Sequence, residues 1–326
     1  MHNPEFHRNL GPFTLRQIAD FIDAKLECND ENFLINDFNS TDKASKLDIT
    51  FLVNDFYDNI NLIESKTFIV SNSNRISSNT GRNILRVENV HLAVAKLSNK
   101  FFDSYSENLI SSLKPAFFNR ECKLLDNSAI ISNGSIFGKN ANIKSGVYVG
   151  HNCVFGDNVT IGNNTIITNS IIGDNVKIGR NCSIGQPGFG FAINSPSNEN
   201  IFHKGRVIMQ NNVQVGSNCC IDRGSFKDTI IGENTYMDNM CHIAHNVQIG
   251  RNCVFAGCLG VAGSAKIGDF VFTGGQVGIA GHINIGDRVK IAAQSGVFSS
   301  VDNDENLMGS PAINRFKYIK NFKKKY

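Results

Sequence analysis

Residues 231–297 read, in groups of six, IGENTY MDNMCH IAHNVQ IGRNCV FAGCLG VAGSAK IGDFVF TGGQVG IAGHIN IGDRVK IAAQSG V. An aliphatic or similar residue opens every group, twelve times in succession without a slip. A period of six fits neither an α-helix, with its period of 3.6, nor an amphipathic strand, with its period of two. The stretch therefore predicts a repeat architecture.

The same step of six recurs earlier in the chain. It runs from Phe137 to Ile167, resumes from Ile172 to Ile184 after a one-residue deletion, and continues at Met209, Val215 and Ile221. The residue after the aliphatic is often Gly, and the fifth residue of the group is small. This is the hexapeptide pattern of a parallel β-helix, so the fold class is mainly β.

Three groups of six should form one triangular coil of 18 residues, with the aliphatic side chains pointing inward. Successive coils should lie about 4.8 Å apart, the spacing of paired strands. The small fifth residue fits the corner, and Gly and Asn tolerate the positive φ expected in its turns. The pattern does not fix the handedness, but hexapeptide solenoids as a family are left-handed, so we expect a left-handed parallel β-helix.

The repeat divides the chain into three parts. Residues 1–120 lack it and predict a small α/β domain, residues 121–305 the β-helix, and residues 306–326 a short basic C-terminal helix or tail. Thr14 to Gln17 resembles a capping box that opens a helix, and a second helix is expected over about 90–102. Strands are expected near 48–53 and 66–70. Between 186 and about 206 a polar segment containing Gln-Pro-Gly-Phe-Gly-Phe-Ala replaces the repeat, and such a long loop is usually functional.

The composition sets wider limits. The chain has 326 residues, 41% hydrophobic and 19% charged, with a net charge of +3. No apolar stretch is long enough to cross a bilayer, and the first ten residues do not resemble a signal peptide, so we expect a cytoplasmic protein. We expect no nucleic-acid partner. Five of the nine cysteines occupy the small fifth position of a group, where Cys acts as a small buried hydrophobe: Cys153, Cys182, Cys219, Cys241 and Cys253.

Histidine is the residue type in the repeat that could carry chemistry. His245 and His282 are 37 residues apart, which is two coils plus one residue, so they should project from one edge, roughly 10 Å apart. Gly263 lies one coil after His245 and could present a free backbone N–H. A base beside an oxyanion donor is the arrangement that acyl transfer needs.

A zinc site is the competing hypothesis for these histidines, because some hexapeptide solenoids are carbonic anhydrases. Here His242 and His245 stand three residues apart with no close third histidine in the same coil. We therefore expect no metal.

Several motifs resemble UDP-3-O-(3-hydroxyacyl)glucosamine N-acyltransferase, an enzyme family of lipid A biosynthesis. They are Gly188-Phe-Gly-Phe-Ala192, Ile221-Asp-Arg-Gly224, Asp228-Thr-Ile-Ile-Gly232, Asp238-Asn239, Ile243-Ala-His-Asn-Val247, Gly281-His282 and Gly309-Ser-Pro311. The resemblance covers almost the whole chain. It implies transfer of a 3-hydroxyacyl chain from acyl carrier protein to the 2-amino group of the UDP-sugar substrate. It also implies a homotrimer, and no bound cofactor beyond the phosphopantetheine that the carrier protein itself carries.

The resemblance also assigns residues. His245 matches the general base and Gly263 the oxyanion-hole glycine. The substrate-binding positions it implies are His282, Asp238, Asn239 and, as a clamp on uridine, Phe51, Asn54 and Tyr57.

Some positions depart from the pattern that the family leads us to expect, among them Pro187, where an acidic or small residue is expected before Gly188. His242 stands where a polar residue that does not titrate is expected, and Gly296 lies near the place where the family sets acyl length, where it would leave room for a longer chain.

The C-terminal tail carries basic residues without an acid: Arg315, Lys317, Lys320, Lys323, Lys324 and Lys325. It is either a solvated terminus or a docking surface for an acidic partner, such as acyl carrier protein, or for anionic lipid. Two other functions stay open: a sugar acetyltransferase that uses acetyl-CoA, and a structural β-helix without catalysis.

Overall fold

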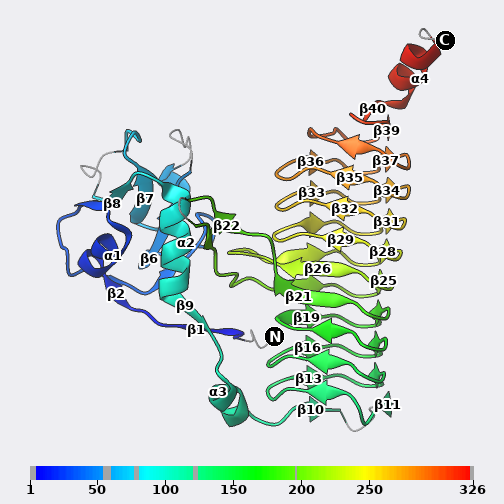
Figure 1. The fold of residues 1–326 in the computed structure, drawn as a ribbon, viewed down its shortest axis with the longest axis horizontal. Coiled ribbons are helices and arrows are strands. Elements are labelled where there is room, and N and C mark those ends of the chain that lie inside the picture. Colours follow the sequence, from blue (N-terminus) through cyan, green and yellow to red (C-terminus); the bar gives the residue numbers. More distant parts are fainter. Residues whose placement is uncertain (1–4, 54–59, 77–80, 120–123, 195–196, 324–326) are drawn as a thin grey trace. The chain divides into compact units, whose positions relative to one another are not determined.

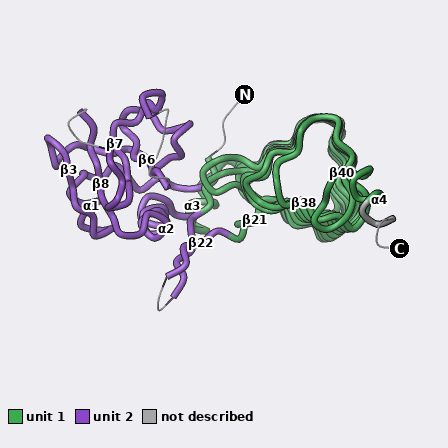
Figure 2. Tube along the Cα trace, turned by 90° about the horizontal axis from the view of Figure 1, so that it is seen from above, with its two compact units in different colours: residues 1–6, 106–189, 203–326 green, residues 7–105, 190–202 purple. Residues whose placement is uncertain are grey.

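The structure is a computed structural model that describes residues 5–53, 60–76, 81–119, 124–194 and 197–323. The chain divides into two compact units (Figure 2). The β-helix unit contains residues 1–6, 106–189 and 203–326, and the α/β unit contains residues 7–105 and 190–202. This division differs from the contiguous ranges expected from the repeat. Residues 1–6, 106–120 and 306–326 group with the β-helix, and residues 190–202 group with the α/β unit.

The β-helix unit has three faces, each a sheet that runs along the coils (Figure 1). In the described residues, face 1 consists of β10 (Phe117–Phe118), β13 (Ile136–Phe137), β16 (Val154–Phe155), β19 (Ser170–Ile172), β24 (Val207–Met209), β27 (Thr229–Ile231), β30 (Gln248–Ile249), β33 (Lys266–Ile267) and β36 (Asn284–Ile285). Face 2 consists of β11 (Leu124–Leu125), β14 (Asn142–Ile143), β17 (Thr160–Ile161), β20 (Lys177–Ile178), β25 (Gln214–Val215), β28 (Tyr236–Met237), β31 (Val254–Phe255), β34 (Phe272–Thr273), β37 (Lys290–Ile291), β39 (Asn306–Met308) and β40 (Ile313–Asn314). Face 3 consists of β12 (Ile130–Ile131), β15 (Tyr148–Val149), β18 (Ile166–Ile167), β21 (Ser183–Pro187), β26 (Cys220–Arg223), β29 (His242–Ile243), β32 (Gly260–Val261), β35 (Gly278–Ile279) and β38 (Gly296–Val297).

The register confirms the predicted coil length. Ile243 of β29 pairs in parallel with Val261 of β32, which pairs with Ile279 of β35, at steps of 18 residues. The predicted left-handed parallel β-helix is therefore confirmed.

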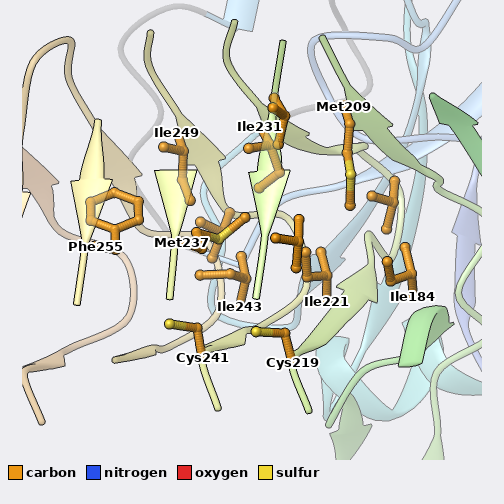
Figure 3. Packing of buried hydrophobic residues seen from close by; sticks show 14 of the residues in the cluster. Ile184, Met209, Cys219, Ile221, Ile231, Met237, Cys241, Ile243, Ile249 and Phe255 are labelled. Atoms are coloured by element: carbon orange, nitrogen blue, oxygen red, sulfur yellow. The ribbon is translucent and has the colours of Figure 1, made fainter. Parts of the chain in front are cut away.

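The core of the β-helix is the column of residues that open the groups of six (Figure 3). All twelve from Ile231 to Val297 are at most 4% exposed. The small fifth residues are also buried, and the five cysteines predicted at that position are among them. The hydrophobic effect of stacking these apolar side chains therefore holds successive coils together.

The corners confirm the positive φ expected for Asn and Gly. It belongs to the fourth residue of the group, as at Asn246 with φ 60° and Gly146 with φ 69°, and not to the Gly that often follows the aliphatic. That Gly is required by close approach instead: a Cβ on Gly250 would lie 2.6 Å from the carbonyl carbon of Gly268 in the next coil.

The α/β unit is built on a sheet with strand order β3–β8–β7–β6–β5. These strands are β3 (Lys25–Glu27), β5 (Asp37–Phe38), β6 (Asp48–Phe51), β7 (Thr67–Ser71) and β8 (Asn83–Val87). The shorter elements are β1 (His7–Asn9) with β9 (Phe102–Ser104), β2 (Phe13–Thr14) with β4 (Leu34–Ile35), β22 (Phe191–Ala192) with β23 (Glu199–Asn200), and the 3₁₀ helix η1 (Ile60–Leu62).

Two helices of the α/β unit were predicted correctly. Helix α1 (Leu15–Ile22) begins at the capping box of Thr14 and Gln17 and buries Leu15, Ile18, Ala19 and Ile22. Helix α2 (Val90–Phe101) lies within the predicted range and buries Val90, Ala93, Val94 and Leu97. The β-helix unit adds α3 (Glu107–Ser112) and α4 (Arg315–Lys323). Among the residues described, the helices are too short and too polar to span a membrane.

Candidate active site

Strand β29 belongs to face 3 (Figure 1). His245 lies at the corner that follows this strand. The inward side chain of Ile243, which is fully buried, anchors this corner two residues earlier. The imidazole itself is only partly buried. The repeat thus holds the backbone of His245 in place while its ring stays accessible.

Gly263 occupies the equivalent corner one coil later. The Ser264 N–H donates to the carbonyl of His245 at 2.9 Å, which ties the two corners together. A Cβ on Gly263 would lie 2.7 Å from both Cε1 and Nε2 of His245, so only Gly lets the ring lie this close. Within the described residues the Gly263 N–H donates no hydrogen bond, and it can therefore serve an incoming oxygen.

Asn246 fixes the other side of the ring. Its Oδ1 accepts the Ser225 backbone N–H at 2.8 Å, which determines how the amide is turned. Its Nδ2 then lies 2.9 Å from Nδ1 of His245 and donates to it. A neutral His245 bonded in this way carries its proton on Nε2.

Burial lowers the pKa of His245, and the nearby charges of His282 and His242 lower it further, while a hydrogen bond with the backbone of Phe189 opposes the shift. The ring is therefore neutral at pH 7, as a general base must be.

Two neighbours of this ring were missed by sequence reasoning. A Cβ on Gly188 would lie 2.8 Å from Cβ of His245, and the His203 ring packs edge-on against the His245 ring with centroids 5.6 Å apart. Both belong to the segments that flank the interrupting loop. The Gly-Phe-Gly-Phe motif was a signal that the loop matters, but the broken repeat gave no means of placing it.

A groove of about 520 Å³ begins at His245 and follows face 3 toward the C-terminal coils. Its lining residues are almost all apolar or glycine: Phe189, His242, Ala244, His245, Gly260, Val261, Ala262, Gly263, Gly278, Ile279, Ala280, Gly296, Val297 and Phe298. Gly260 and Gly278 have open space where a Cβ would stand, so they leave a channel above the sheet. Such a channel suits a hydrocarbon chain.

The groove is closed near its far end. A Cβ on Gly296 would meet Ser310 Oγ at 2.8 Å and the Phe298 ring at 3.1 Å. Gly296 therefore adds no open space in this structure, in contrast to the longer channel that its small size suggested.

His282 lies near His245, but its position in the coil differs. It is the left-handed corner residue, with φ 58°, and its N–H donates to the carbonyl of Gly263 at 3.1 Å. Its side chain is exposed. The ring thus stands in solvent beside the pair of His245 and Gly263.

Asp238 and Asn239 lie at another corner, between faces 2 and 3, at the opposite edge of face 3 from His245. The Asn239 side chain donates to the Asp238 carboxylate at 2.8 Å and accepts the Ser217 N–H at 2.8 Å. Within one chain the structure therefore does not bring these two residues to His245.

The predicted uridine clamp falls partly outside the description. Phe51 ends β6 and is partly buried, with its ring 5.6 Å from that of Phe38. Asn54 and Tyr57 lie outside the described residues. In the described part of the chain, no three His, Cys, Asp or Glu side chains come together as they would around a metal ion.

Comparisons with known proteins identify the family of the chain. The bacterial transferase hexapeptide family (six repeats) matches residues 228–263, which include His245 and Gly263. A UDP-3-O-acylglucosamine N-acyltransferase of Rickettsia bellii is 37% identical over 291 residues, covering 81% of this chain and 80% of that protein. The chain belongs to the UDP-3-O-acylglucosamine N-acyltransferase family.

Other relatives support the same assignment. A family member from Rickettsia akari is 36% identical over 273 residues, covering 81% of this chain and 79% of that one. Among solved structures, a UDP-N-acetylglucosamine acyltransferase from Campylobacter jejuni has a TM-score of 0.53 at 26% identity, over 58% of this chain and 73% of that chain. The protein is thus an N-acyltransferase, and the pair of His245 and Gly263 at the head of an apolar groove is the candidate centre of that chemistry.

Proposed function

We propose that this N-acyltransferase moves a 3-hydroxyacyl chain from acyl carrier protein to the 2-amino group of UDP-3-O-(3-hydroxyacyl)glucosamine. The product would be UDP-2,3-diacylglucosamine, an intermediate of lipid A biosynthesis. The observation that carries the proposal is the imidazole of His245 beside the Gly263 N–H at the head of the groove. The names of the relatives supply the sugar substrate.

The reaction follows from these groups. The sugar amine attacks the thioester carbonyl carbon, forming a C–N bond, and the carbonyl oxygen becomes an oxyanion bonded to the Gly263 N–H. The nitrogen gives its proton to His245, the C–S bond breaks, and His245 returns the proton to the phosphopantetheine sulfur. The thioester supplies the driving force, and the reaction uses no resident cofactor or metal.

The tautomer of His245 places a condition on this proton transfer. With Nδ1 bonded to Asn246, a neutral ring carries its proton on Nε2, the nitrogen that faces Gly263. Accepting a proton at Nε2 requires the opposite tautomer, so the Asn246 bond must open during the cycle.

The substrates would be bound by separate parts of the chain. The groove would hold the acyl chain, because its wall is apolar over three coils. His282 would assist in binding the sugar beside His245. In the α/β unit, Phe51, Asn54 and Tyr57 would hold the uracil by stacking and hydrogen bonding.

A homotrimer would complete the site. Asp238 and Asn239 lie at the edge of face 3 away from His245, so within one chain they cannot contribute to it. A second copy that brings this edge to the groove would do so, giving three equivalent sites around a threefold axis. Sedimentation of the purified protein tests the assembly, and a monomer would contradict it.

The basic residues of α4 would dock the acidic carrier protein. Arg315, Lys317, Lys320 and Lys323 belong to this helix, whose first turn has no acid. Replacing Lys317 and Lys320 by Glu should raise KM for the carrier-bound donor and reduce its salt dependence. Unchanged kinetics would remove α4 from docking.

The decisive experiment is a mass-spectrometric assay. Purified protein is mixed with UDP-3-O-acylglucosamine and 3-hydroxyacyl carrier protein, and the wild type is compared with His245→Ala. The wild type should form the doubly acylated sugar, and the variant should lose most of this activity. Acetyl-CoA serves as the competing donor: its preferential use would show a sugar acetyltransferase instead, and no product from any donor would leave a structural β-helix.

A further inference from the structure

The groove has little polarity apart from the catalytic histidine. Among the described residues that line it, His242 and His245 are the only ones whose side chains carry a nitrogen or oxygen atom. His242 lies on face 3 and pairs in register with Gly260, whose column continues through Gly278 to Gly296. His242 therefore closes the end of the glycine column that lies nearest His245.

A nearly buried carboxylate stands behind His242. The Asp222 side chain is 13% exposed, the His242 side chain is 52% exposed, and Oδ2 of Asp222 lies 3.8 Å from Nε2 of His242. Burial raises the pKa of Asp222, and the charge of His242 opposes this shift. This separation is too long for a hydrogen bond but within the range of an electrostatic contact, so Asp222 favours the ring position that keeps Nε2 on its side.

The position of His242 relates to the donor that the proposed function requires. If the thioester carbonyl lies between His245 and the Gly263 N–H, the third carbon of the acyl chain lies two carbons further along. His242 is three residues from His245, and both side chains line the same groove. A hydroxyl on that third carbon can both donate and accept a hydrogen bond, and an imidazole can do the same.

We infer that His242, oriented by Asp222, binds the 3-hydroxyl group of the acyl donor and makes the enzyme select hydroxylated chains. This inference rests on the proposed function and deepens it. Selection arises because an acyl chain without the hydroxyl leaves the polar edge of His242 facing a methylene group.

The test compares two carrier-bound donors of equal chain length, one with the 3-hydroxyl and one without. We expect the kcat/KM of the wild type to be on the order of tenfold higher for the hydroxylated donor, because one hydrogen bond distinguishes the two donors. In His242→Leu, the ratio of kcat/KM between the two donors should approach one, because only the reaction of the hydroxylated donor slows. His242→Gln keeps a hydrogen-bond donor and acceptor, so it should retain part of the preference for the hydroxylated chain. Asp222→Asn should show a preference between those of the wild type and His242→Leu.

Cys220 provides the matched control. It precedes His242 in the same column of face 3, is exposed, and lies outside the groove lining. Cys220→Leu should leave the donor ratio unchanged, and thermal melts should show all variants folded. An unchanged ratio in His242→Leu, an equal loss with both donors, or a wild type that uses both donors equally would overturn the inference while the acyl transfer itself stands. A wild type that forms no product from either donor would overturn the proposed function.

Discussion

The side-chain amide of Asn246 donates to Nδ1 of His245 at 2.9 Å, and the Ser225 N–H holds that amide in place from its other side. Asn246 is therefore a positioning residue for the ring that we propose as the general base. The bond determines the ring plane and also the nitrogen that carries the proton. The resting enzyme thus holds His245 in the tautomer that cannot accept a proton at Nε2.

Asn246→Asp reverses this preference. A carboxylate keeps the bond from the Ser225 N–H but accepts from Nδ1–H, so it favours the tautomer with a free Nε2 and raises the pKa of His245. The rate requires a neutral imidazole and falls as the pH drops through the pKa of His245, which burial holds below its ordinary value of about 6.5. The acidic limb of the kcat/KM–pH profile should therefore move to higher pH, by about one unit.

Asn246→Leu is the control for lost orientation. It removes the hydrogen bond to Nδ1 of His245 without adding a charge. We therefore expect kcat to fall, and the acidic limb of the pH profile to lie at lower pH than in the Asp variant. Two outcomes would contradict this role of Asn246 in setting the tautomer of a basic His245. One is an Asp variant with the wild-type pH profile, and the other is an Asp variant that is folded but inactive.

The repeat allowed the β-helix and the centre of the site to be predicted, because a fixed coil length converts sequence separation into position. Gly263 follows His245 by 18 residues and lies against its ring, as expected. The same reasoning works for buried positions such as Ile243 and Cys241, since burial follows the period.

Contacts that depend on the interrupting loop could not be predicted. Gly188 and His203 pack on His245 from segments in which the repeat is broken. Their separation from His245 in sequence therefore does not predict where they lie in space. The Phe298 ring beside Gly296 was also missed, because the period gives the direction of a side chain but not its rotamer.

Gly263→Ala tests the close approach of the two corners. The added Cβ would lie 2.7 Å from Nε2 of His245, so the ring must move away from the oxyanion position. We expect kcat to fall on the order of 10²-fold with little change in the melting temperature. Gly275→Ala is the matched control, because its Cβ would meet only the Gly257 carbonyl at 3.4 Å. Equal effects of the two changes would show that Gly263 matters for folding alone.

Thiol labelling tests the interior of the β-helix. Burial raises the pKa of Cys153 to about 12 and that of Cys253 to about 11, and both side chains are fully buried. Both should resist alkylation in the native protein at pH 8 and react in guanidinium, as measured by peptide mass spectrometry. Native-state labelling of either as fast as that of exposed Cys220 would contradict the coil packing.

The far end of the groove offers a test of acyl length. The Phe298 ring and Ser310 close the space above Gly296, whereas the space above Gly278 is open. Phe298→Ala should let donors with longer chains bind, since each further buried CH₂ contributes about 0.8 kcal/mol, roughly fourfold in kcat/KM. Gly278→Leu fills the channel one coil nearer to His245 and should shift the preference to shorter chains. A series of carrier-bound donors of increasing length measures both shifts, and variants that keep the wild-type preference would show that the acyl chain does not follow this groove.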